Sequence, residues 1–186
     1  MRCMIIAAVG AALLRTAAGA QGRADFSGRW TSEPPAAVPS ARDAAAERAR
    51  PADRTMDLGS GWGRTITIAQ DNRSLTVEWP YFSSYDLQPP LRFVYALDGS
   101  ETVNTIMLGR GMQRQRSRSE WVGSSLVITT THSFTDPASG RPVDSEVRQT
   151  LALESPTSLV VETVRSGALG GPPSTTRTVY TKGGGA

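Results

Sequence analysis

The feature that most constrains this chain is an alternation of apolar and polar residues that recurs from residue 65 to residue 182. Ile66 and Ile68 alternate with threonines, and Leu75, Val77 and Trp79 alternate with polar residues. A period of two predicts strands with one buried and one exposed face. Turn-forming residues divide the alternation into about ten short segments at roughly 8–12-residue spacing, which favours a sandwich or a barrel over β-α-β units.

The connections between these segments are mostly short, so strands that follow one another in the sequence should pair as hairpins. Asp98-Gly99, for example, is a strong signal for a tight hairpin turn. A long meander of this kind avoids exposed edges most simply by closing on itself. We therefore predict an all-β fold, a single up-and-down antiparallel β-barrel of about 8–10 strands.

The barrel should occupy residues 21–182 as one domain. Within it, residues 33–54 are rich in proline and alanine and lack an apolar stripe, so we expect a flexible loop or a short helix there. The glycine-rich residues 183–186 are expected to form a disordered tail.

The N-terminus has the composition of an export signal. Met1-Arg2 gives a basic start, an apolar stretch follows as far as Leu14, and small residues stand at Ala18 and Ala20. This order predicts a secretory signal peptide over residues 1–20. The apolar stretch is shorter than the roughly 20 residues that cross a bilayer. We expect a secreted or periplasmic protein with no stable membrane span after the signal is removed.

The composition argues against several function classes. Lys and Arg number 20 against 17 Asp and Glu, a formal net charge of +3, which does not suit a general nucleic-acid-binding protein. His132 is the only histidine and Cys3 the only cysteine, so we expect neither a metal site nor a cofactor. No nucleophile elbow is present. We expect a monomeric binding protein rather than an enzyme, with a lumenal enzyme that uses His132 as an alternative.

Two short motifs carry a resemblance to a known group of barrels. Gly28-Arg29-Trp30 on the first expected strand and Arg177 on the last resemble the lipocalin-like, or calycin-type, barrels, here in the form of an exported bacterial domain. The resemblance implies that the tryptophan plugs one end of the barrel and that a basic residue from the last strand packs across it. Gly28, Trp30 and Arg177 would then form a structural closure, in which the guanidinium gains a cation–π contact with the indole.

The interior of the barrel can be inferred from one hairpin. With Gly123-Ser124 as its turn, residues that face each other across the two strands share one side of the sheet. These opposed pairs are Trp121 with Leu126, Ser119 with Ile128, Ser117 with Thr130, and Gln115 with His132. The predicted inner wall is thus apolar near the turn and polar farther along, and a polar inner wall is unfavourable unless it contacts water or a ligand.

We therefore expect a cavity near Gln115 and His132 in which a small apolar or amphipathic molecule binds. The candidate ligand-binding residues are Trp79, Phe93, Tyr95, Gln115, Trp121 and His132.

The alternative is a filled barrel that serves as a periplasmic protein-interaction or inhibitor module, through the loop at residues 81–85. The same hairpin sends Arg114, Arg116 and Arg118 outward, as an anion-binding stripe or as a solvated strand face.

Overall fold

The computed structural model describes residues 22–32, 59–80, 88–108, 111–135, 139–166 and 172–183. The expected signal peptide, residues 33–54 and the loop at residues 81–85 lie outside these ranges. Of the expected tail, Gly183 is described, and its amide donates a hydrogen bond to the Arg29 carbonyl (2.8 Å).

The described residues form an all-β structure, which confirms the predicted fold class. The ten strands are β1 (Gly28–Ser32), β2 (Thr65–Gln70), β3 (Ser74–Trp79), β4 (Leu91–Ala96), β5 (Thr102–Leu108), β6 (Gly111–Val122), β7 (Ser125–Thr135), β8 (Pro142–Ser155), β9 (Ser158–Arg165) and β10 (Ser174–Lys182). No helix in this part of the chain is long and apolar enough to cross a membrane.

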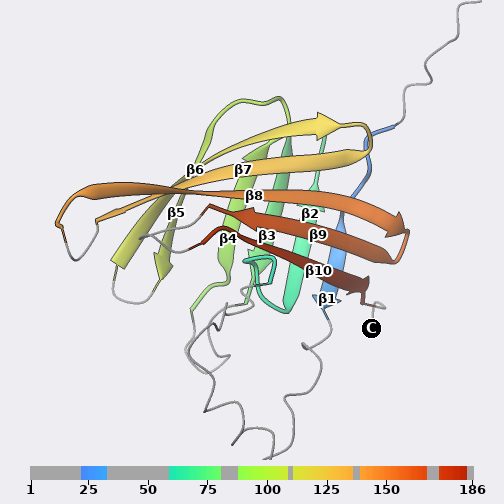
Figure 1. Ribbon diagram of the computed structural model, residues 1–186. Coiled ribbons are helices and arrows are strands. Elements are labelled where there is room, and N and C mark those ends of the chain that lie inside the picture. Colours follow the sequence, from blue (N-terminus) through green and yellow to red (C-terminus); the bar gives the residue numbers. More distant parts are fainter. Residues whose placement is uncertain are drawn as a thin grey trace, which may run out of the picture.

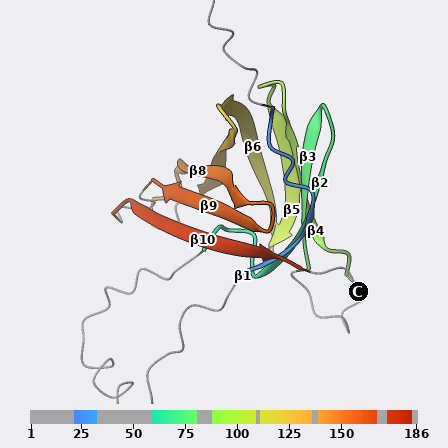
Figure 2. The same cartoon turned by 90° about the vertical axis from the view of Figure 1, so that its right-hand side faces the viewer.

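All ten strands belong to one antiparallel sheet with the order β4-β3-β2-β1-β10-β9-β8-β7-β6-β5. Strands that are consecutive in sequence pair as neighbours, except β4 and β5, which form the two edges of the sheet. In addition, β1 pairs with β10, where Trp30 lies opposite Lys182. The sheet curls so that β8, β9 and β10 cross in front of β2, β3 and β4 in Figure 1. The perpendicular view of Figure 2 shows these two groups of strands on opposite sides. The result is a nearly closed up-and-down barrel.

The gap between β4 and β5, which we call the seam, is bridged by side chains instead of a strand ladder. The Asn104 amide accepts a hydrogen bond from the Val94 N–H (2.8 Å) and donates one to the Val94 carbonyl (3.0 Å). The Ser119 hydroxyl donates to the Ala96 carbonyl. These bonds pair main-chain groups at the edge of β4 that would otherwise lack partners.

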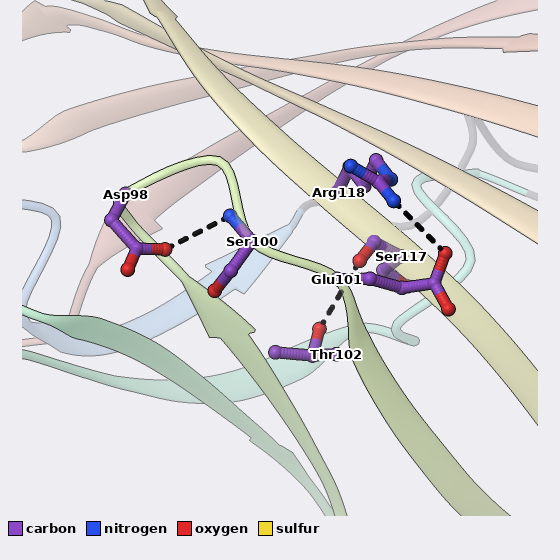
Figure 3. A network of polar contacts seen from close by, with 6 residues as sticks. All are labelled: Asp98, Ser100, Glu101, Thr102, Ser117 and Arg118. Atoms are coloured by element: carbon purple, nitrogen blue, oxygen red, sulfur yellow. Dashed lines mark hydrogen bonds and ion pairs between the residues drawn. The ribbon is translucent and has the colours of Figure 1, made fainter.

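The two ends of the barrel differ in their connections. Tight turns join β2 to β3, β4 to β5, β6 to β7 and β8 to β9 at one end, the turn end. Figure 3 shows the β4–β5 turn, where the Asp98 carboxylate accepts a hydrogen bond from the Ser100 amide (2.9 Å) and Arg118 pairs with Glu101 (3.5 Å). At the opposite end, the mouth, lie the strand ends that the remaining connections join, from β1 to β2, β3 to β4, β5 to β6, β7 to β8 and β9 to β10.

Aromatic side chains fill the turn end. The Trp30 indole is fully buried and donates a hydrogen bond to the Phe26 carbonyl (2.8 Å). The Phe26 ring stacks on Trp121, with centroids 6.0 Å apart and planes 9° from parallel. Trp30 therefore lies within the packed aromatic group that occludes this end of the barrel.

The cation over Trp30 is Lys182, whereas Arg177 was expected there. The Lys182 ammonium lies 5.2 Å from the centre of the Trp30 ring, which is within cation–π range. The buried side of β10 carries Tyr180, so Arg177 points outward, remains 49% exposed and pairs with Glu154. The prediction of Arg177 as part of the closure was wrong because the inward and outward residues of this strand were exchanged.

Gly28 allows the end of β10 to approach the first strand. Its φ angle is +145°, and a Cβ at this position would lie 2.5 Å from the Lys182 Cε. A side chain here would therefore be strained and would displace the lysine that covers Trp30.

Candidate functional site

A cavity of about 440 Å³ lies at the mouth of the barrel and is partly open to solvent. This volume falls within the range of roughly 300–1,000 Å³ that is typical of small-molecule sites. The residues that line it are Ser60, Gly61, Trp62, Gly63, Trp79, Phe93, Tyr95, Ile106, Gln113, Gln115, Thr130, His132, Val147, Gln149 and Arg165.

One wall of the cavity is aromatic. Trp79, Phe93 and Tyr95 come from β3 and β4, and Trp62 joins them from the segment before β2. The Trp62 indole donates a hydrogen bond to the Tyr95 hydroxyl (3.2 Å), with the two rings tilted by 50°. Burial raises the pKa of Tyr95, so its hydroxyl stays protonated at neutral pH. This wall offers a broad apolar face to a ligand.

The other wall is polar and is formed by β6, β7 and β8. Gln115 lies opposite His132 and Ser117 opposite Thr130, which confirms the register predicted from the Gly123-Ser124 turn. Ser117 and Thr130 satisfy each other through a hydrogen bond between their hydroxyls (2.9 Å). Gln149 adds an amide from β8. The inner surface of β6 and β7 is thus mainly apolar near the turn, at Trp121, Leu126 and Ile128, and polar at the mouth, as the hairpin predicted.

The side chains of Gln115 and His132 make no hydrogen bond to any described residue, although both line the cavity. Gln115 is only 7% exposed. Burial, and then the positive charge of Arg165, lower the pKa of His132, so its imidazole is neutral at pH 7. The amide of Gln115 is not among the fully buried polar atoms without a partner, which in the described residues are Trp121 Nε1 and Thr163 Oγ1. Its polar groups are therefore accessible from the cavity and available to a molecule inside it.

The segment Gly59–Gly63 forms part of the cavity and is anchored to the barrel interior by hydrogen bonds. The Gly59 carbonyl accepts bonds from Arg165 and Thr176 (both 2.8 Å), and the Ser60 carbonyl accepts one from Gln149 (2.6 Å). The Tyr180 hydroxyl bonds to the Ser60 hydroxyl (2.5 Å) and donates to the Gly63 carbonyl (2.6 Å). These contacts hold the segment across the inside of the strands.

Gly63 brings the main chain directly against the Trp79 indole. Its φ angle is +81°, and a Cβ at this position would overlap the Nε1 and Cε2 atoms of Trp79. The absence of a side chain at residue 63 therefore sets the position of the Trp79 ring in the aromatic wall.

The structure brings Trp79, Phe93, Tyr95, Gln115 and His132 together around the cavity. Ligand binding by these five residues stays a prediction. Trp121 does not line the cavity, because it packs on Phe26 at the turn end. The sequence reasoning missed other lining residues, chiefly Trp62, Gln149, Arg165 and the Gly59–Gly63 segment. The three glycines around Ser60 and Trp62 were a signal that could have indicated this segment.

The three outward arginines of β6 are exposed, as the hairpin predicted. Arg118 forms an ion pair with Glu101, and its side chain is 66% exposed. These arginines lie on the opposite side of the strand from Gln115 and therefore take no part in the cavity.

Among the residues that the structure describes, no group of three or more His, Cys, Asp or Glu side chains is placed to hold a metal ion. The sequence matches no known family model and no curated protein.

Proposed function

We propose that this chain is an exported, lipocalin-like barrel that binds a small amphipathic molecule in its mouth cavity. The observation that carries the proposal is the division of one cavity of about 440 Å³ into an aromatic wall and a polar wall. A molecule with an apolar body and a polar edge satisfies both walls at once. Export rests on the residues 1–20 discussed above.

The aromatic wall supplies most of the affinity in this proposal. Burial of apolar surface contributes roughly 25 cal/mol per Å², and aromatic pairs add about 0.5–1.5 kcal/mol beyond their area. The polar wall supplies orientation, because few but well-placed polar groups fix a ligand in a mostly apolar site. The alternative of a filled barrel that acts through its loops does not account for a cavity of this size.

The proposal is tested with the neutral fluorescent probe N-phenyl-1-naphthylamine. We expect saturable binding to the mature protein, followed as an increase of probe fluorescence. Trp79→Ala should weaken the affinity about tenfold, because the probe loses one aromatic face. Trp121→Ala is the matched control, since it removes an indole of similar burial from the turn end.

Thermal unfolding of both variants shows whether each remains folded. The proposal is refuted by a lack of saturable binding, or by equal losses of affinity in two folded variants, because either result would separate binding from the cavity.

A further inference from the structure

The buried amide of Gln115 is the strongest indication of what the cavity accepts, and the inference drawn from it rests on the proposed function. Gln115 is more than nine-tenths buried and lines the cavity, and its side-chain amide bonds to no described residue. Other buried amides of the barrel are engaged: Asn104 bridges the seam, and Gln149 donates to the Ser60 carbonyl. The polar groups of Gln115 are therefore left for a ligand.

His132 lies beside Gln115 and adds a second unused polar group. The two residues are directly opposite each other on β6 and β7, where the Cβ atoms of an antiparallel pair are about 4.5–5.5 Å apart. Both side chains line the cavity. Together they form one patch of hydrogen-bonding groups that faces the aromatic wall.

The donors and acceptors of this patch define a complementary ligand edge. The Gln115 amide presents a C=O acceptor and an N–H donor side by side. A ring that carries an N–H next to a C=O, as a lactam does, can accept and donate one hydrogen bond each to that amide. The neutral imidazole of His132 has one further donor and one further acceptor.

The charge of the lining argues against one class of ligand. Arg165 is the cationic residue among those that line it, so a positively charged ligand is disfavoured. The Arg165 guanidinium donates to the Gly59 carbonyl and to the Thr176 hydroxyl (3.2 Å), so these donors hold the wall of the cavity together. The remaining polar groups of the lining are amides, hydroxyls and the imidazole.

We propose that the cavity recognises a neutral, planar aromatic molecule with a lactam-type edge. The ring lies along the aromatic wall near Trp79 and Phe93, and the N–H and C=O of the edge pair with the Gln115 amide beside His132.

The experiment compares three bicyclic probes of similar size by titration calorimetry. 2-Quinolinone has the lactam edge, 2-methoxyquinoline lacks the N–H, and 1-naphthoate carries a negative charge instead. We expect the full mature protein to bind 2-quinolinone about tenfold more tightly than either of the other two, because the lactam both donates to and accepts from the Gln115 amide, whereas the other two probes can only accept.

Variants then assign the preference to one side chain. Gln115→Leu should weaken 2-quinolinone binding about tenfold and weaken 2-methoxyquinoline binding clearly less, so that the preference between the two probes is lost. Gln115→Met, which keeps the length of the side chain, should behave in the same way. Arg116→Leu, on the outer face of the same strand, should change neither affinity. Since the side-chain amide of Gln115 makes no bond to the described residues, both Gln115 variants should unfold thermally at or above the wild-type temperature.

The outcomes separate the two proposals. If N-phenyl-1-naphthylamine binds but 2-quinolinone has no advantage over 2-methoxyquinoline, or if 1-naphthoate binds most tightly, the lactam inference is wrong and the proposed function stands. If the Gln115 variants retain the preference, the inference is also wrong. If none of the probes binds, both proposals fail.

Discussion

The contact between Gly63 and Trp79 leads to a quantitative prediction about a pair of glycines. Gly61 and Gly63 both line the cavity and both have positive φ angles, +89° and +81°. They differ in the space around them. A Cβ at residue 61 would lie 3.6 Å from the Arg165 Nη2, which is ordinary van der Waals contact, whereas a Cβ at residue 63 would overlap the Trp79 indole. Alanine at each position therefore separates the conformational cost from the steric cost.

In both alanine variants the left-handed main-chain conformation lowers the free energy of unfolding by about 1–2 kcal/mol. Both also gain about 0.4–1 kcal/mol because alanine restricts the unfolded chain. These two contributions nearly cancel in a comparison of the variants. Gly63→Ala must in addition displace the Trp79 ring, and overpacking of this kind destabilises a protein by about 1–3 kcal/mol. We expect Gly63→Ala to be less stable than Gly61→Ala by that amount.

Urea unfolding followed by tryptophan fluorescence measures this difference. The titration of N-phenyl-1-naphthylamine gives a second readout, since a displaced Trp79 ring should weaken probe binding only in Gly63→Ala. Equal free energies of unfolding for the two variants, with equal probe affinities, would show that the close approach of Gly63 to the indole does not determine the shape of the cavity.

Two further predictions concern the seam and the buried hydroxyl of Tyr180. Asn104→Leu should lower the free energy of unfolding by about 2–4 kcal/mol, because it leaves the Val94 N–H and C=O without partners. The control Thr105→Val, on the outer face, should change the free energy of unfolding by less than about 0.5 kcal/mol. Urea unfolding gives both values, and equal effects of the two substitutions would contradict the role of the seam. Burial raises the pKa of Tyr180 to about 12, with the Ser60 hydrogen bond opposing the shift. The unfolded chain loses this proton first, near pH 10, so the stability conferred by the protonated hydroxyl should fall between about pH 10 and pH 12. Thermal unfolding across this range should show a shallower fall for Tyr180→Phe, and an unchanged slope would refute this assignment.

The fold and one wall of the cavity were predictable from the sequence because local patterns determine them. The alternation defines the strands, and the Gly123-Ser124 turn sets the register that places Gln115 opposite His132. Once a turn and one buried pair are known, every other pair in that hairpin follows, since side chains alternate between the two faces.

Other features depend on contacts that no local pattern encodes. Along β10 the inward and outward residues are both largely polar; Thr176, for example, lies on the inner face. The alternation therefore could not show which face of the strand points inward, and so whether Arg177 or Lys182 reaches Trp30. Trp121 packs with Phe26 because the start of β1 and the Gly123 turn meet at the same end, a relation set by the whole barrel. Whether the interior was filled or hollow depended on side-chain packing across strands that are far apart in sequence.

The pairing of β1 with β10 has a consequence for how the chain folds. Trp30 and Lys182 stand opposite each other although almost the whole sequence separates them, so the last contact of the barrel cannot form before the C-terminal strand is available. Contacts of such long range slow folding, typically to milliseconds or seconds. Until then the unpaired edges of β1 and β9 are exposed, and partly folded chains with such edges are prone to aggregate. The lifetime of that incomplete state, more than the stability of the finished barrel, should therefore govern the yield of folded protein.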